Sequence, residues 1–198
     1  MSAAEEATSP RERLLAGAIA HVSQHGVGEI SLRQLAAALG TSHRMLLYHF
    51  GSREALLIEV IRTVEEQQRA ALAQILEEEA DAPPQEIMRR MWARVADPAL
   101  WPNERLFFEV YGQGLQGQMP AAEMLDGIVD SWLEPSVRLA VQLGMAPEHA
   151  VPFARLGIAV TRGLLLDLLA TGDREAVDAA MEHWIRLNEP LFAARRGA

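Results

Sequence analysis

The sequence predicts an all-α protein of about nine helices, in which a small N-terminal three-helix domain precedes a larger helical bundle. Apolar residues recur at helical spacing along most of the 198 residues, and no stretch shows the sustained alternation of a half-buried strand. Capping residues, glycines and prolines separate the helical segments. A hydrophobic content of 49% is ample for two cores.

The N-terminal domain is expected at residues 10–54, after a polar, disordered tail at residues 1–9. Its first helix is predicted to run from Pro10 to His25, because Pro10 suits a first helical turn and apolar residues mark one face. The apolar residues of that face are Leu14, Leu15, Ala18, Ile19 and Val22.

Two short helices are predicted within residues 31–50. Ser31 with Gln34 three residues later forms a capping box, and Gly40 suits the end of a helix. Ser42 is placed to cap the next helix, so only a tight turn separates the two. Two helices joined in this way predict a helix-turn-helix, whose second helix can enter the major groove of DNA.

The larger bundle is expected at residues 55–198. The helix that leads into it is capped by Ser52 and runs to about Glu79, a length of about 28 residues or 40 Å. One continuous helix therefore links the helix-turn-helix to the bundle. Pro135 is expected to kink or break the helix that contains it. The other predicted helices cover residues 85–96, 104–116, 121–144, 147–170 and 173–192.

The net charge of −9 argues against DNA binding only when it is averaged over the whole chain. Residues 1–62 hold six arginines and six acidic residues, whereas residues 63–198 hold twelve arginines and 21 acidic residues. Between residues 30 and 53 there are three arginines and no acidic residue. The positive charge therefore lies on the helix-turn-helix, where attraction to phosphates requires it.

Composition argues against several other classes of protein. The absence of cysteine excludes disulfides and thiolate metal sites and favours a cytoplasmic protein. No segment resembles a signal peptide, and no apolar run approaches the roughly 20 residues that span a bilayer. No nucleophile with a base, carboxylate pair or metal set stands out, so we expect neither an enzyme nor a cofactor. His21 and His25 have metal-ligand spacing, but no third ligand is evident nearby, and no metal site is predicted.

The region from Arg11 to Arg62 resembles the DNA-binding domain of the TetR family of ligand-responsive bacterial transcriptional repressors. The motifs that carry the resemblance are, in order, Gly40-Thr41-Ser42, Leu46, Tyr48-His49-Phe50, Ser52-Arg53-Glu54 and Leu56-Leu57. Two positions depart from the family pattern, which commonly has tyrosine at Leu47 and often has glycine at Arg44. These departures affect the operator sequence that is read rather than the resemblance itself.

The first turn of the second helix is predicted to contact DNA bases, because the N-terminal residues of a recognition helix reach base edges. Arg44 can bond bidentately to guanine, worth roughly 1–3 kcal/mol of discrimination. His43 can donate to a base or phosphate, and Met45 can touch a thymine methyl group. The predicted phosphate contacts are Arg33, Thr41, Ser42, Tyr48 and His49. The alternative is a solvated helical hairpin inside some other all-helical protein.

The resemblance also implies a small-molecule pocket in the bundle. Ten aromatic and methionine residues crowd into the 45 residues from Met88 to Trp132, and such side chains adapt to irregular apolar ligands. The alternative for each of them is an ordinary place in the core. The predicted ligand-binding residues are Met88, Trp92, Phe108, Tyr111, Gln113 and Trp132.

The last two helices carry more apolar residues than one stripe requires, which predicts a homodimer interface. The alternative is a helix buried within one subunit. The predicted interface residues are Leu156, Val160, Leu164, Leu168, Met181 and Trp184.

By this resemblance, the chain is expected to be a repressor that a small apolar or amphipathic effector releases from a near-palindromic double-stranded operator. The alternative function is an all-helical carrier or sensor of small molecules, with a DNA domain that no longer works.

Overall fold

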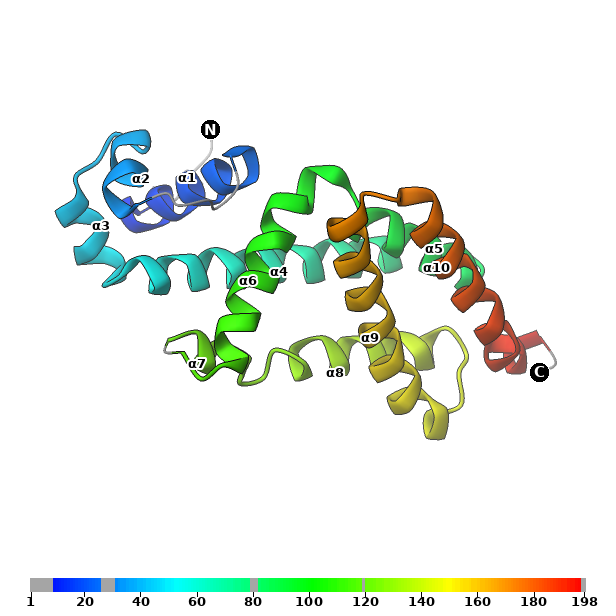
Figure 1. The fold of residues 1–198 in the computed structure, drawn as a ribbon. Helices are drawn as coiled ribbons and strands as arrows, with labels where there is room; N and C mark the ends of the chain where they lie inside the picture. The colour runs from blue at the N-terminus through cyan, green and yellow to red at the C-terminus, as the bar shows by residue number, and fades with distance from the viewer. Residues whose placement is uncertain (1–8, 26–30, 79–81, 119, 197–198) are drawn as a thin grey trace, which may run out of the picture. The chain divides into compact units, whose positions relative to one another are not determined.

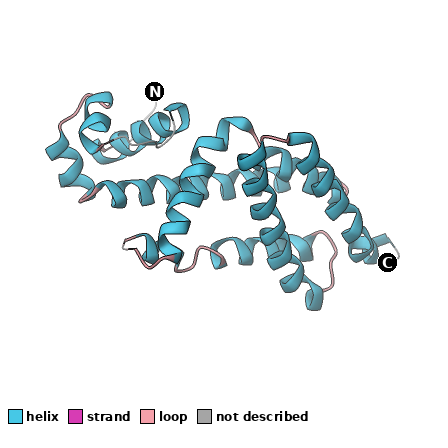
Figure 2. Cartoon of the chain, viewed as in Figure 1, coloured by secondary structure: helices cyan, strands magenta, loops and turns pink. Residues whose placement is uncertain are grey.

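The computed structural model describes residues 9–25, 31–78, 82–118 and 120–196, so the predicted tail lies outside the described residues apart from Ser9. Every regular element in these ranges is a helix, which confirms the all-α fold class (Figures 1 and 2). The α-helices are α1 (Pro10–His25), α2 (Leu32–Ala38), α3 (His43–Phe50), α4 (Arg53–Glu78), α5 (Pro84–Val95), α6 (Trp101–Leu115), α7 (Ala121–Leu125), α8 (Asp130–Gln142), α9 (Pro147–Thr171) and α10 (Arg174–Asn188), and the 3₁₀ segments are η1 (Pro98–Leu100) and η2 (Glu189–Arg196).

The helix predicted at residues 121–144 is divided into α7 and α8. Of the two outcomes expected at Pro135, a break does not occur, because Pro135 lies inside α8, and a kink stays a prediction. The chain instead leaves α7 near Gly127, whose φ of 74° is the left-handed conformation that ends helices and that glycine adopts without strain. Proline is a strong signal for the interruption of a helix, and the residues around Gly127 carry no comparable signal. The sequence therefore suggested a break at Pro135 rather than near Gly127.

The described residues group into two compact units. The helix-turn-helix unit comprises residues 1–65 and 102–122, and the bundle unit comprises residues 66–101 and 123–198. The first unit extends beyond the predicted boundary after Glu54, because the first turns of α4 and most of α6 group with α1–α3. Helix α4 is a single helix of 26 residues that belongs to both units.

The core of the helix-turn-helix unit is built from one face of each of its helices. Side chains from α1–α4 and α6 are buried in it, and they include Ala18, Val22, Leu35, Leu46, Leu56, Val60, Leu106 and Val110. A Cβ atom added at Gly17 would lie 2.8 Å from Cδ2 of Leu39, so glycine lets α1 approach the end of α2 closely. Burying each large aliphatic side chain contributes roughly 1.5–3 kcal/mol, and this burial holds the recognition helix in place.

The core of the bundle unit lies among α5, α8, α9 and η2. It contains a cluster of buried residues, which are Ile87, Ala140, Leu143, Met145, Ala150 and Phe192. The ring of Phe153 stacks on Trp184 with centroids 6.1 Å apart, which ties α9 to α10. No helix within the described ranges combines the length and apolar content needed to cross a membrane.

An ion pair joins α5 to α10 in the bundle unit. Arg89 donates to Glu182 through two parallel hydrogen bonds, from Nε at 2.8 Å and from Nη2 at 2.9 Å. These bonds favour the charged carboxylate and hold the pKa of Glu182 below its ordinary value of 4.5. A carboxyl group with a lowered pKa stabilises the fold above its unfolded pKa, and that contribution disappears as the pH falls through the folded value.

Glu182→Gln is therefore expected to lower the free energy of unfolding by up to about 1 kcal/mol at pH 7, the upper range for a partly exposed pair. Urea unfolding at neutral pH and at acidic pH measures the difference, which should shrink as the pH falls through the lowered pKa of Glu182. Glu134→Gln is the control, because it removes an exposed pair with Arg138 within a single helix. A difference between Glu182→Gln and the natural chain that does not decrease at acidic pH would contradict this account.

Candidate nucleic-acid interface

Helix α2 begins at the predicted capping box. The Ser31 hydroxyl accepts a hydrogen bond from the Gln34 backbone amide at 3.3 Å, and the Gln34 side chain accepts one from the Ser31 amide at 2.8 Å. Both donors belong to a helix end that has no internal partner for them. This reciprocal cap sets where α2 starts, and it places Arg33 on the exposed side of the first turn.

The turn between α2 and α3 is as tight as predicted. Gly40 takes a left-handed φ of 64°, and the amide of Thr41 donates back to the carbonyl of Ala36 at 2.9 Å. Ser42 then caps α3, because its hydroxyl accepts from the Met45 amide at 3.2 Å. These local contacts confirm the predicted helix-turn-helix geometry.

Helix α3 has a buried side and an outward side. Leu46 and Phe50 are buried at 0% and 6% exposure and anchor the helix to the core. The outward side carries Arg44, Met45 and Tyr48, and the Tyr48 side chain is 79% exposed. Arg44 and Tyr48 are four residues apart, so they share one face of the helix. This face offers a guanidinium and a phenol in the positions from which a recognition helix contacts DNA.

The other predicted DNA contacts are placed less uniformly. Ser42 is exposed, whereas Thr41 and His43 are half-buried at the start of α3. The Nε2 atom of His49 is buried and makes no hydrogen bond to any described residue, so this atom is not offered to a phosphate. A phosphate contact by His49 would have to come from its other ring nitrogen, and this role stays a prediction.

Leu47 is a position that the predicted site left out. Its side chain is 38% exposed on α3, beside the outward face. The sequence did offer a signal for this position, because the TetR family, which the chain resembles, commonly has a tyrosine there. A leucine there offers an apolar surface to DNA but no hydrogen bond.

Arg11 is a second residue that the predicted site left out, and it braces the end of α3. Its Nε donates to the carbonyl of His49 at 3.4 Å, and its guanidinium carbon lies 5.0 Å from the centroid of the Phe50 ring. The same side chain forms an ion pair with Glu59 of α4. A cation at a helix C-terminus is favourable because it opposes the negative end of the helix dipole. Arg11 thus ties α1, α3 and α4 together.

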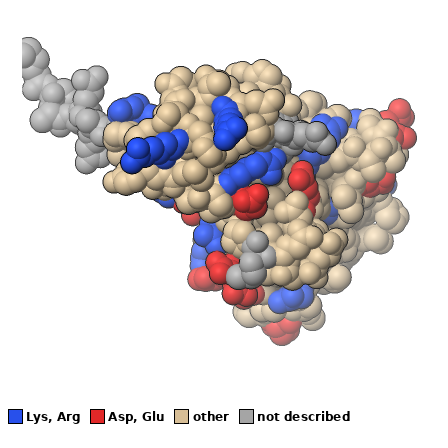
Figure 3. Space-filling model, turned by 60° about the vertical axis from the view of Figure 1, so that its left-hand side comes forward, with Lys and Arg blue, Asp and Glu red and all other residues tan. Residues whose placement is uncertain are grey.

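The charge distribution of this unit matches the expectation from the sequence. In Figure 3, which brings the α1–α3 end of the chain forward, the charged atoms in view over these helices are mainly those of arginine. Three arginines and no acidic residue occur between residues 30 and 53. Such a surface attracts the phosphates of nucleic acid.

Three of the predicted ligand-binding residues lie in the bundle unit, in separate settings. Trp92 is buried, and its Nε1 donates to the Asp178 carboxylate at 2.5 Å. Met88 is partly buried and packs against the core cluster. The Trp132 ring lies under the guanidinium of Arg69, 5.5 Å from its centroid. Trp92 is therefore committed to packing between α5 and α10.

The other three lie on α6 in the helix-turn-helix unit. Phe108 and Tyr111 are half-buried around Phe107, with ring centroids 5.3 Å and 5.5 Å from it. Gln113 donates to the Glu109 carboxylate at 3.4 Å. The pocket role of all six residues stays a prediction.

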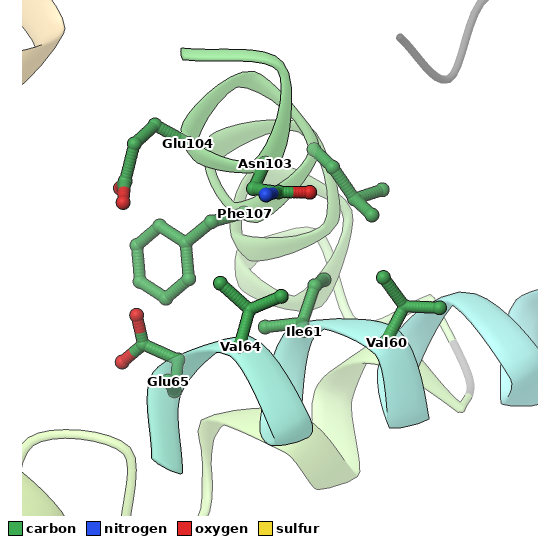
Figure 4. A pocket seen from close by; sticks show the side chains of 8 residues that line it. Val60, Ile61, Val64, Glu65, Asn103, Glu104 and Phe107 are labelled. Carbon is green, nitrogen blue, oxygen red and sulfur yellow. The ribbon is translucent and has the colours of Figure 1, made fainter. Parts of the chain in front are cut away.

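A small cavity lies between α4 and α6 (Figure 4). Val60, Ile61 and Val64 of α4 face α6 across it. Asn103 donates from Nδ2 to the Ser23 hydroxyl at 3.0 Å, while its buried Oδ1 accepts no hydrogen bond from the described residues. A volume of about 10 Å³ leaves room for roughly one water molecule, which that oxygen can accept from.

A second hollow of about 60 Å³ lies where the first turns of α4 meet α6. Buried Leu57, Ile58 and Val110 form its floor, and Gln113 stands among its polar lining. Both spaces are far smaller than the roughly 300–1,000 Å³ of typical ligand sites.

The predicted dimer residues divide between surface and core. Leu156 is 55% exposed, and Val160, Leu164 and Trp184 are half-buried. Leu168 and Met181 are buried at 0% and 5% exposure inside their own subunit, so placing them at an interface is wrong. Residues four apart advance about 40° beyond a full turn, and the row from Leu156 to Leu168 therefore winds from the surface into the core.

A different row of α9 remains on the surface. We call it the apolar α9 face, and its exposed members are Pro152, Leu156, Ala159, Gly163, Leu166 and Ala170. Helix α10 adds exposed residues that are also small or apolar apart from one histidine, namely Ala176, Ala180, His183 and Leu187. A charge-free face of this length is uncommon on a helix that meets only water.

His21 and His25 stack on each other with ring centroids 4.5 Å apart. Within the described ranges, no group of three or more histidine and acidic side chains is arranged to hold a metal ion.

Comparison with known proteins adds to this geometry. The model of the family described as bacterial regulatory proteins, tetR family, matches residues 14–60. No curated protein matches the chain significantly. A transcriptional regulator from Rhodococcus sp. Rha1 has a similar structure, with 19% identity, a TM-score of 0.73, and 90% of this chain and 95% of that chain covered.

Two further structures have the same fold. A TetR transcriptional regulator from Legionella pneumophila is 20% identical, with a TM-score of 0.66 and coverage of 92% of this chain and 98% of that chain. The multidrug binding protein EbrR, complexed with imidazole, is also 20% identical, with a TM-score of 0.62 and coverage of 89% and 90%.

Proposed function

We propose that this chain, whose residues 14–60 match the model of the tetR family of bacterial regulatory proteins, is a transcriptional repressor that binds DNA as a homodimer. The observation that carries the proposal is the outward face of α3, where Arg44 and Tyr48 project from a helix that Leu46 and Phe50 anchor. The functional DNA-binding domain is proposed at residues 10–54, with effector binding and dimerisation in residues 55–198. The protein acts in the cytoplasm, where its operator lies.

Each proposed DNA contact follows from the chemistry of one side chain. Arg44 reads guanine, Met45 contacts a thymine methyl group, and His43 donates to a base or phosphate. The proposed phosphate contacts are Arg33, Thr41, Ser42 and Tyr48. His49 stays a proposed phosphate contact through its other ring nitrogen, because its Nε2 is buried.

Two recognition helices are needed for tight binding, since a single small module buries too little surface for high affinity. In a two-fold dimer they enter successive major grooves about 34–36 Å apart on a near-palindromic operator. The apolar α9 face and the exposed side of α10 form the proposed interface. Of the residues predicted from the sequence, Leu156 lies in this interface, and the half-buried Val160, Leu164 and Trp184 lie at its border. The structure adds Leu166 and Leu187 to the proposed interface.

A small apolar or amphipathic effector is proposed to release the operator. The likeness in fold to a multidrug binding protein is in keeping with such an effector. Helix α4 transmits the effect, because only two residues separate it from α3 and it continues into the bundle unit. Effector and operator then compete through one conformational equilibrium of α4.

Selection of random duplex DNA by the purified chain tests the proposal. We expect an enriched near-palindrome for the natural chain, and one relaxed base position for Arg44→Ala. Loss of a bidentate guanine contact should cost about 1–3 kcal/mol at that position. Tyr48→Phe should weaken binding to all sequences alike, because a phosphate contact carries no sequence information.

No enrichment at moderate salt, from protein stripped of bound small molecules by unfolding and refolding, would overturn the proposal. The chain would then be an all-helical carrier or sensor of small molecules. Ligand binding without any sequence-specific DNA affinity would identify that alternative.

A further inference from the structure

The side chain of Arg69 joins α4 to α8 in the bundle unit. The guanidinium carbon of Arg69 lies 5.5 Å from the ring centroid of Trp132, within the range of a cation–π interaction. Nη1 of Arg69 lies 3.4 Å from the hydroxyl of Ser131. All three side chains are half-buried, where a cation–π contact is worth more than on an open surface.

The α8 side of this contact is braced from a third helix. The Ser131 hydroxyl donates to the carbonyl of Ile128 at 3.1 Å, and Nη2 of Arg162 in α9 donates to the same carbonyl at 3.3 Å. Ile128 is 8% exposed and follows the left-handed Gly127. Arg69 therefore holds a turn whose position depends on both α8 and α9.

Helix α4, which carries Arg69, follows directly after the recognition helix α3. Only Gly51 and Ser52 separate α3 from α4, and the Ser52 hydroxyl accepts from the Ala55 amide at 3.0 Å. Arg69 lies on the same unbroken helix, about four and a half turns from its start. A helix of this length transmits a tilt from one end to the other.

We infer that Arg69 is a positioning residue for operator binding. Through Trp132 and Ser131 it holds α4 in the orientation that places the recognition helices on DNA. An effector that engages the Trp132 ring or moves the first turn of α8 breaks this contact. The operator-competent population then falls, and the apparent dissociation constant rises in inverse proportion. This inference depends on the DNA-binding function proposed above.

A double-mutant cycle in the full chain tests the inference with the selected duplex as probe. Arg69→Met keeps most of the aliphatic stem and removes the charge, and Trp132→Leu removes the ring. We expect each to raise the operator dissociation constant by roughly 2- to 30-fold, the range of a cation–π contact. The double variant should be no weaker than the worse single variant, because both remove the same contact. Arg69→Lys should recover part of the affinity.

Arg138→Met is the matched control, since it removes an exposed arginine of α8 that pairs with Glu134 of the same helix. Urea unfolding of every variant separates stability from positioning. If Trp132→Leu does not fold, Trp132→Phe completes the cycle with a smaller expected change.

Coupling that appears in the unfolding free energy while operator affinity stays unchanged would overturn the inference and leave a purely structural contact. A natural chain that binds no duplex would overturn the proposed function and the inference with it. The natural chain, measured in the same series, tells these two results apart.

Discussion

Leu46→Ala is expected to lower the free energy of unfolding by about 2–5 kcal/mol and to abolish operator binding. Leu46 is fully buried in the middle of α3, so truncation leaves a cavity between the recognition helix and the core. Native domains are stable by only about 5–15 kcal/mol, and the loss is a large part of that margin. An eight-residue helix cannot hold its shape without such packing, because isolated helices this short are marginal in water.

Leu47→Ala is the matched control, since it makes the same change one residue later on a side chain that is 38% exposed. Its unfolding free energy should stay within about 0.5 kcal/mol of the natural value. Urea unfolding and titration of the selected duplex measure the two effects. Equal destabilisation by the two substitutions would show that α3 does not pack as described.

Leu166→Glu is expected to dissociate the homodimer and to weaken operator binding by at least about 100-fold. Leu166 is 53% exposed on the apolar α9 face, where a partner helix would have to bury the new carboxylate in apolar surroundings. Losing the second recognition helix removes the avidity of two linked sites, which is worth about 10²–10⁴ in affinity. The isolated subunit should keep its fold, because the substitution lies on its surface.

Val151→Glu provides the control for charge alone. Val151 is 50% exposed on the same helix, but it is rotated about 100° away from the apolar α9 face. Sedimentation velocity gives the oligomeric state, and circular dichroism checks the helix content. A Leu166→Glu variant that remains a dimer with natural operator affinity would place the interface elsewhere.

The sequence was sufficient for the features that depend on neighbours a few residues away. The caps at Ser31, Ser42 and Ser52 were predictable because each hydroxyl meets an amide three residues later. The limits of α1 and the split between α2 and α3 follow from the same local rules. For this reason the all-α class and the helix-turn-helix could be predicted without coordinates.

The tertiary structure alone decided which faces of those helices are covered. Arg11 meets His49 and Glu59 across 38 and 48 residues, and Arg69 meets Ser131 across 62, separations that no periodicity reveals. Leu156 and Leu168 look equivalent as members of a row of apolar residues spaced four apart, yet one is exposed and the other fully buried. Apolar periodicity predicts that a face of a helix is buried in the functional protein. Whether its own subunit or a partner hides it depends on the packing of distant segments.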